Sequence, residues 1–114
     1  MQYALLIYRQ ADVIEGDTEA ERDQVSKQYW AMRDIPEVTG GAGLQPVETA
    51  TTLRSQDGQM LVTDGPFADT KEVFAGFYLV EADDLDRATE IAGQIPALRF
   101  GGSVEIRPVY GPQQ

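Results

Sequence analysis

The sequence contains no histidine and no cysteine. These two residues supply the commonest general base, the thiolate nucleophile and most ligands of zinc and iron sites, so their absence excludes all three chemistries. A chain without cysteine also has no disulfide framework, which is typical of a protein of the cytosol. Carboxylates, lysine and tyrosine are left for any acid–base chemistry.

Positive charge and long apolar runs are scarce as well. Nine basic residues stand against 19 acidic ones, and the resulting net charge of -10 repels nucleic acid phosphates and anionic membrane surfaces. No apolar run approaches the roughly 18 residues of a membrane span. Residues 1–8 lack the basic leader and the cleavage site of a signal peptide. We therefore expect a cytoplasmic protein that binds neither nucleic acid nor membrane.

The 114 residues suit one domain over residues 1–114, because a second domain would lack a core. Residues 3–8 form a short apolar run with aromatic ends, which predicts a central strand. A helix from about 19 to 33 follows, since Thr18 and Glu21 have the spacing of a capping box and apolar residues recur at helical spacing. Pro36 comes directly after the residue at which this helix should end.

The middle of the chain predicts a turn and then a hairpin. Glycines within residues 40–43 favour a turn back toward the sheet. Residues 49–55 and 60–63 are strand-like and flank an Asp57-Gly58 pair, which is the signal of a tight hairpin turn.

Three further elements complete the chain. Residues 73–82 predict a long strand with two apolar faces. Asp83 or Asp84 caps a helix whose apolar stripe runs from residue 85 to 95, and Pro96 stops it. Residues 103–110 alternate as a last strand, placed at an edge because Pro108 cannot donate to a ladder.

The order strand, helix, hairpin, strand, helix, strand predicts an α+β fold of the ferredoxin-like split βαβ type, with an antiparallel sheet and two helices on one face. The uncovered face would then be too apolar to remain in water. We expect two such faces to pack together in a symmetric homodimer, a dimeric α/β barrel with a cavity between the sheets. The residues behind this expectation are Tyr8, Phe77, Tyr78, Leu79 and Val109.

The segment from Asp64 to Glu72 is the strongest candidate for chemistry. A carboxylate on a stiff loop at a cavity mouth is a suitable general base, and Asp64 is the first choice. Lys71 and Arg54 would hold an anionic substrate or stabilise a developing enolate oxygen. The remaining candidates, which would contact the substrate, are Tyr8, Tyr78, Phe67 and Glu72.

The same segment also has a purely structural interpretation. Gly65 permits a positive φ, Phe67 plugs the core, and Asp69 or Thr70 caps a turn. Lys71 and Glu72 would then form a solvated ion pair worth under about 1 kcal/mol.

A metal site at the segment is a third alternative. Asp64, Asp69 and Glu72 offer oxygen ligands for Mg²⁺ or Ca²⁺, but the loop lacks the ligand spacing of calcium loops. We expect no metal. We also expect no cofactor, because the chain has neither a phosphate-binding loop nor a dinucleotide fingerprint.

The run Asp64-Gly65-Pro66-Phe67, followed by Thr70-Lys71-Glu72 and Gly76-Phe77-Tyr78-Leu79, resembles the DGPF branch of the YCII-related family. The resemblance extends from residue 1 to about residue 110. It implies a ferredoxin-like dimeric α/β barrel and a genetic link to extracytoplasmic-function sigma factors, hence to stress regulation. Some members use a histidine and aspartate pair in the cavity, and this chain lacks the histidine.

Two functions follow from these observations. The first is an isomerase or lyase that moves a proton on a small polar compound, with Asp64 as base. The second is a dimer without catalytic activity that binds a metabolite or a regulatory protein, with the Asp64 loop as a structural clamp.

Overall fold

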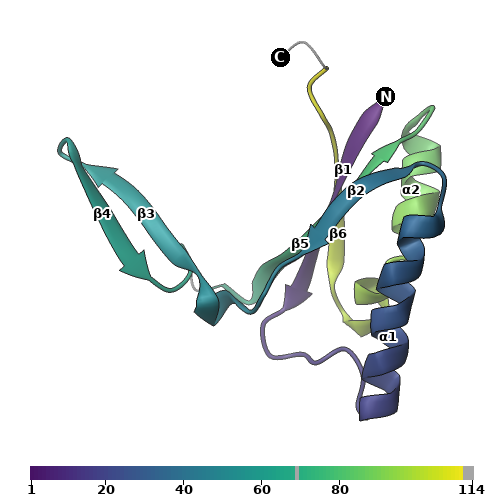
Figure 1. Ribbon diagram of the computed structural model, residues 1–114, viewed down its shortest axis with the longest axis horizontal. Helices are drawn as coiled ribbons and strands as arrows, with labels where there is room; N and C mark the ends of the chain where they lie inside the picture. The colour runs from purple at the N-terminus through teal and green to yellow at the C-terminus, as the bar shows by residue number, and fades with distance from the viewer. Residues whose placement is uncertain (69, 112–114) are drawn as a thin grey trace.

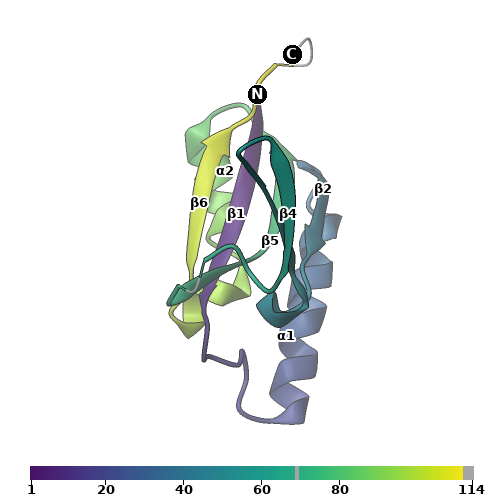
Figure 2. The same ribbon diagram turned by 90° about the vertical axis from the view of Figure 1, so that its left-hand side faces the viewer.

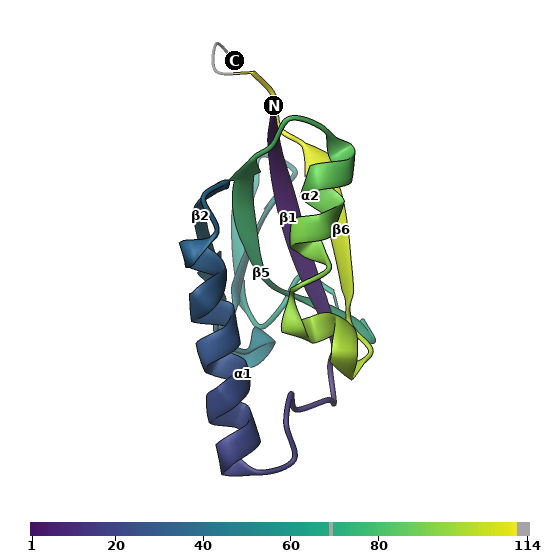
Figure 3. The same ribbon diagram turned by 90° about the vertical axis from the view of Figure 1, so that its right-hand side faces the viewer.

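The computed structural model describes residues 1–68 and 70–111. Its core is a four-stranded antiparallel sheet in the order β2-β5-β1-β6. Both helices lie on one face of this sheet, and a separate hairpin stands on the side of the other face (Figures 1 and 3). The sheet strands are β1 (Gln2–Gln10), β2 (Val38–Gly43), β5 (Glu72–Glu81) and β6 (Ser103–Pro108). The helices are α1 (Glu19–Ala31) and α2 (Leu85–Ala92), and the hairpin strands are β3 (Thr51–Gln56) and β4 (Gln59–Asp64).

Alternating side chains of the central strands form the core between sheet and helices. Leu5 on β1 is fully buried and lies opposite Tyr78 on β5 and Ile106 on β6. The prediction that residues 3–8 form a central strand is therefore confirmed. Helix α2 contributes most to the helical side of the core, through Ala88, Ile91 and Ala92.

Both predicted helix starts are confirmed. The Thr18 hydroxyl accepts a hydrogen bond from the Glu21 amide at 3.1 Å, and the Asp84 carboxylate accepts one from the Arg87 amide at 2.9 Å. Such caps satisfy amides that have no partner within the helix. Helix α2 ends at Ala92 rather than near residue 95, and a short 3-10 helix (Pro96–Phe100) follows.

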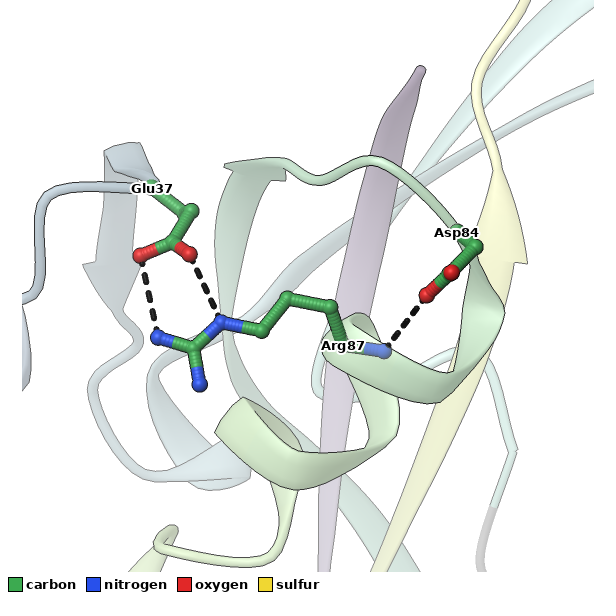
Figure 4. Close-up of polar contacts among 3 residues, drawn as sticks. All are labelled: Glu37, Asp84 and Arg87. Atoms are coloured by element: carbon green, nitrogen blue, oxygen red, sulfur yellow. Dashed lines mark hydrogen bonds and ion pairs between the residues drawn. The ribbon is translucent and has the colours of Figure 1, made fainter.

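A charged pair ties α2 to the start of β2. The Arg87 guanidinium donates to both carboxylate oxygens of Glu37, with Nε–Oε2 at 2.6 Å and Nη2–Oε1 at 3.1 Å (Figure 4). This fork-like geometry is the stronger form of an Arg–carboxylate contact.

The prediction of a simple turn at residues 40–43 was wrong, because these residues belong to the edge strand β2. Glycines allow an unusually close approach here. A Cβ at Gly76 of β5 would lie 2.7 Å from the Ala42 carbonyl oxygen, and Gly41 has a φ of +149°. A strand built on glycines carries little of the β-branched signal by which strands are recognised in a sequence.

The predicted hairpin exists, with Asp57 and Gly58 at positive φ in its turn, but it does not join the main sheet. Among the described residues, strands β3 and β4 pair only with each other, and they project from the body (Figures 1 and 2). The strand that pairs with β5 at this edge of the main sheet is β2, and neither hairpin strand takes that place. Apolar side chains of the hairpin are exposed as a result, among them Leu53, Met60 and Val62.

The sheet face away from the helices has no cover within the described residues. It carries the partly exposed side chains of Tyr8, Phe77 and Leu79, as the sequence predicted, together with that of Leu6. Tyr78 instead points to the helical side and is buried. A register shift between Ile7 and Tyr8 also moves Phe74 beside Tyr8, with ring centroids 5.6 Å apart, although strict alternation would place Phe74 on the face of Tyr78.

The longest described helix, α1, has 13 residues. Across residues 1–68 and 70–111, no helix is both long and apolar enough to cross a membrane.

Candidate functional site

A cleft of about 660 Å³ lies between α1 and the neighbouring parts of β1, β2 and β5. In Figure 3, α1 lies beside β2 and β5 on the helical side of the sheet. Ile7, Val25 and Tyr78 supply buried side chains to the cleft. A volume of a few hundred Å³ and a largely apolar floor are typical of sites for small molecules.

Tyr78 and Tyr29 connect the sheet to α1 inside the cleft. The Tyr78 hydroxyl donates a hydrogen bond of 2.6 Å to the Tyr29 carbonyl, and burial raises the pKa of the Tyr78 phenol. The Tyr78 ring is therefore held in place, and its hydroxyl proton is already engaged.

Glu15 faces the cleft from the connection between β1 and α1. Its Oε1 accepts a hydrogen bond from the Tyr29 hydroxyl at 2.7 Å. Its Oε2 is buried and has no hydrogen-bond partner among the described residues. Burial, and then the Glu15 carboxylate, raise the pKa of Tyr29, so this phenol remains protonated as a donor.

Gly16 explains how the chain brings Glu15 to this position. Gly16 is buried with a φ of +117°, and a Cβ there would lie 2.9 Å from the Arg22 amide nitrogen of α1. Only glycine permits both the left-handed conformation and this close approach.

Three arginines line the same cleft: Arg9, Arg22 and Arg33. Arg22 donates to the Gly16 carbonyl at 3.3 Å, while the Arg33 guanidinium lies 4.6 Å from the centre of the Trp30 ring. Within residues 1–68 and 70–111, no carboxylate lies within 4.0 Å of any of the three guanidinium groups.

The predicted residues Arg54, Asp64 and Phe67 lie together on or beside the hairpin, away from the cleft. The Arg54 guanidinium lies 4.6 Å from the Phe67 ring centre and donates to the Phe67 carbonyl at 3.4 Å. Asp64 ends β4 with an exposed side chain. The interpretation of Phe67 as a core plug was wrong, because this side chain is 71% exposed.

The base of the hairpin is nevertheless tied down around Gly65, which has the predicted positive φ of 104°. The Gly65 amide donates to the Ala50 carbonyl, and the Thr52 hydroxyl donates to the Gly65 carbonyl, both at 2.7 Å. These bonds agree with the structural interpretation of this part of the segment.

Lys71 and Glu72 lie at the start of β5 with exposed side chains. The Lys71 carbonyl accepts from the Ala11 amide at 2.8 Å. Among the described residues no carboxylate, including that of Glu72, lies within 4.0 Å of the Lys71 ammonium group, so the predicted ion pair is not formed there. Asp69, which belongs to the metal and turn hypotheses, lies outside the described residues.

The predicted site residues thus occupy three places in one chain. Tyr78 lies in the cleft and Tyr8 on the open sheet face. The third place is the hairpin and the adjoining start of β5, with Arg54, Asp64 and Phe67 and then Lys71 and Glu72.

A comparison with protein families matches residues 1–111 to the model of the YCII-related domain. The chain belongs to the YCII-related domain family. An uncharacterised protein of Rhizobium meliloti (strain 1021) is 36% identical over 114 residues, a match that covers 96% of this chain and 92% of the relative. The resemblance found in the sequence is thereby confirmed at the level of the family.

Sequence reasoning missed the arginines and Glu15 of this YCII-related domain. Arg22 and Tyr29 of α1 and Arg33 of the short 3-10 helix after it (Met32–Asp34) recur at helical spacing, but in the sequence this stretch was assigned only an apolar stripe. The recurrence of arginine beside that stripe is the signal that would have found the cleft wall. Glu15 offered no such signal, because its position depends on the chain path at Gly16.

Proposed function

We propose that this YCII-related protein binds a small molecule in the cleft between α1 and the sheet. The observation that carries the proposal is the combination of about 660 Å³ of open space with buried apolar walls and a buried carboxylate oxygen without a partner among the described residues. Buried polar atoms without partners are rare in folded proteins, and they frequently mark functional sites.

We further propose a ferredoxin-like fold that assembles as a homodimeric α/β barrel. The strand order β2-β5-β1-β6, with a helix between β1 and β2 and another between β5 and β6, supports the fold. The uncovered apolar face with Leu6, Phe77 and Leu79 supports the dimer, because a second copy would remove that face from water.

The hairpin gives the dimer a second contact. It stands off the open side of the sheet (Figures 1 and 2). Its side chains Leu53, Met60 and Val62 are exposed at about 60% or more of their surface. In the dimer these side chains lie against the partner.

A proton-transfer function, as isomerase or lyase, is the second candidate. The arrangement that favours it is Arg54 held over Phe67 close to the end of β4, where Asp64 is the base. Because Tyr8 lies on the open sheet face, such a site is completed between two chains, with Lys71 and Glu72 at its edge. Without catalysis, the same dimer serves as a metabolite-binding or regulatory protein.

Nuclear magnetic resonance with a ¹⁵N-labelled protein and a chemically diverse fragment library tests the proposed function. We expect shift changes to gather on the amides of Val25, Tyr29, Gly43 and Gly76 and on the Trp30 indole. Changes confined to the hairpin would favour the Asp64 site. If no fragment shifts any cleft signal, the cleft is not a binding site and the proposal is wrong.

A further inference from the structure

We propose that the cleft selects a small organic anion with an apolar body and a hydrogen-bond donor, for example a hydroxyaryl carboxylate. The inference rests on the proposed function, since it names the class of molecule that the cleft binds. Three features of the cleft wall carry it, and each corresponds to one part of the ligand.

The first feature is positive charge in a strongly acidic protein. The chain has 19 acidic and nine basic residues, yet three of its arginines line this one cleft. No carboxylate within residues 1–68 and 70–111 lies within 4.0 Å of these guanidinium groups. Arg22 donates to the Gly16 carbonyl at 3.3 Å and Arg33 to the Gly41 carbonyl at 3.5 Å, so these guanidinium groups have neutral partners. An arginine fork matches a carboxylate in two parallel hydrogen bonds, so an anionic ligand supplies the negative charge that these partners lack.

The second feature is the free acceptor on Glu15. Oε2 is shielded from solvent and accepts no hydrogen bond from the described residues, while Oε1 is used by Tyr29. The nearby Tyr78 hydroxyl already donates to the Tyr29 carbonyl. Because Oε2 has almost no accessible surface, the Glu15 carboxylate has to turn toward the cleft to accept from a ligand hydroxyl or amine. Such a ligand removes the unsatisfied acceptor, and a ligand without a donor leaves it unsatisfied.

The third feature is the apolar surface between these groups. Ile7, Val25 and Tyr78 present buried side chains to the cleft, and Trp30 lies at its edge beneath the Arg33 guanidinium. A flat apolar body fits such walls. The ligand class is therefore bipolar, with an anionic end, an apolar centre and a donor.

The chain contains one tryptophan, Trp30, and it lies at the cleft, so its fluorescence reports on binding. Three probes separate the features: 4-hydroxyphenylacetate, phenylacetate without the donor, and 4-hydroxyphenylacetamide without the charge. We expect 4-hydroxyphenylacetate to bind about tenfold more tightly than either of the others, as one charge-assisted hydrogen bond or ion pair allows.

Two variants assign the preferences to residues. Arg22→Gln should weaken both anions about tenfold and leave the amide unchanged, whereas Glu15→Gln should reduce the preference for the hydroxyl to within about threefold. Arg99→Gln is the matched control, because Arg99 bonds Gln28 at 2.7 Å outside this cleft and should not change any affinity. Circular dichroism verifies that each variant folds.

Equal affinity for the three probes, or no binding of any of them, would overturn the inference. This comparison uses the wild-type protein, so it decides the question even if a variant fails to fold. The proposed function fails separately. If library fragments of other chemistry shift the cleft amides while the hydroxyaryl anions do not bind, the cleft is a binding site and only the ligand class is wrong.

Discussion

The Tyr78 hydroxyl on β5 donates a hydrogen bond of 2.6 Å to the Tyr29 carbonyl of α1, and this bond joins the sheet and the helix that form the walls of the cleft. Tyr78→Phe removes the phenol hydroxyl, so the partly buried Tyr29 carbonyl loses this hydrogen-bond donor. We expect a loss of about 1 kcal/mol in the free energy of unfolding, or about 4 °C in Tm, measured by urea and thermal denaturation. An unchanged Tm would show that the bond does not stabilise the packing of α1 on the sheet.

The buried phenols make stability sensitive to alkali. Burial raises the pKa of Tyr29 and Tyr78 above the unfolded value of about 10, so the folded state keeps protons that the unfolded state releases. The two phenols contribute fully to the free energy of unfolding below about pH 10. Above that pH their contribution falls, by up to about 1.4 kcal/mol per pH unit for each phenol. Denaturation from pH 8 to 11 should show a shallower decline in Tyr29→Phe, and a decline as steep as that of the wild type would contradict this account.

The Glu37–Arg87 pair acts at the opposite end of the pH scale. The hydrogen bonds from Arg87 lower the pKa of Glu37 in the folded state. The pair therefore stabilises the fold above the pKa of an unfolded glutamate, and this stabilisation is lost as the pH falls through the lowered pKa. Glu37→Gln should remove this part of the acid dependence and lower Tm by less than Tyr78→Phe does. Thermal melts between pH 3 and 7 test this, and an unchanged acid profile would show that the pair is not formed in solution.

The close contact of β2 and β5 predicts a difference between two glycines. A Cβ at Gly76 would lie 2.7 Å from the Ala42 carbonyl oxygen, whereas a Cβ at Gly43 would meet nothing within 4 Å. We expect Gly76→Ala to cost about 1 to 3 kcal/mol, because a packed backbone has to move. Gly43→Ala is the matched control and should be nearly neutral. Equal Tm values for the two variants would argue against this strand pairing.

The uncovered sheet face predicts self-association. Light scattering on a sizing column should give twice the chain mass of 12.6 kDa. Leu79→Glu places a charge on the open face and should produce monomers, while Glu90→Gln on α2, on the other side of the sheet, should leave the dimer intact. A monomeric wild-type protein would contradict the proposed barrel.

The sequence predicted the elements whose signals are local. The caps at Thr18 and Asp84 and the Asp57-Gly58 turn were correct, because a few neighbouring atoms determine each. Strand β2 was missed because its glycines serve a contact with β5 that lies far away in the sequence.

The candidate site was harder to predict, for the same reason. Tyr78 was predicted for a site beside Asp64 between two sheets and lies instead in the cleft between α1 and the sheet. Glu15 reaches that cleft only through the left-handed turn at Gly16. The Asp64 segment was selected as a candidate site because its ionisable and aromatic residues are close neighbours in the sequence. The cleft instead collects its groups from β1, β2, β5, α1, the 3-10 helix that follows α1 and the β1–α1 connection.

A crystal structure of the protein purified without added ligand tests the central claim most directly. We predict a dimer through the open sheet faces, with each cleft accessible and any retained molecule lying between Arg22, Arg33 and Glu15. A cleft filled by side chains of the same chain or of its partner, with Glu15 Oε2 bonded to protein, would contradict the account.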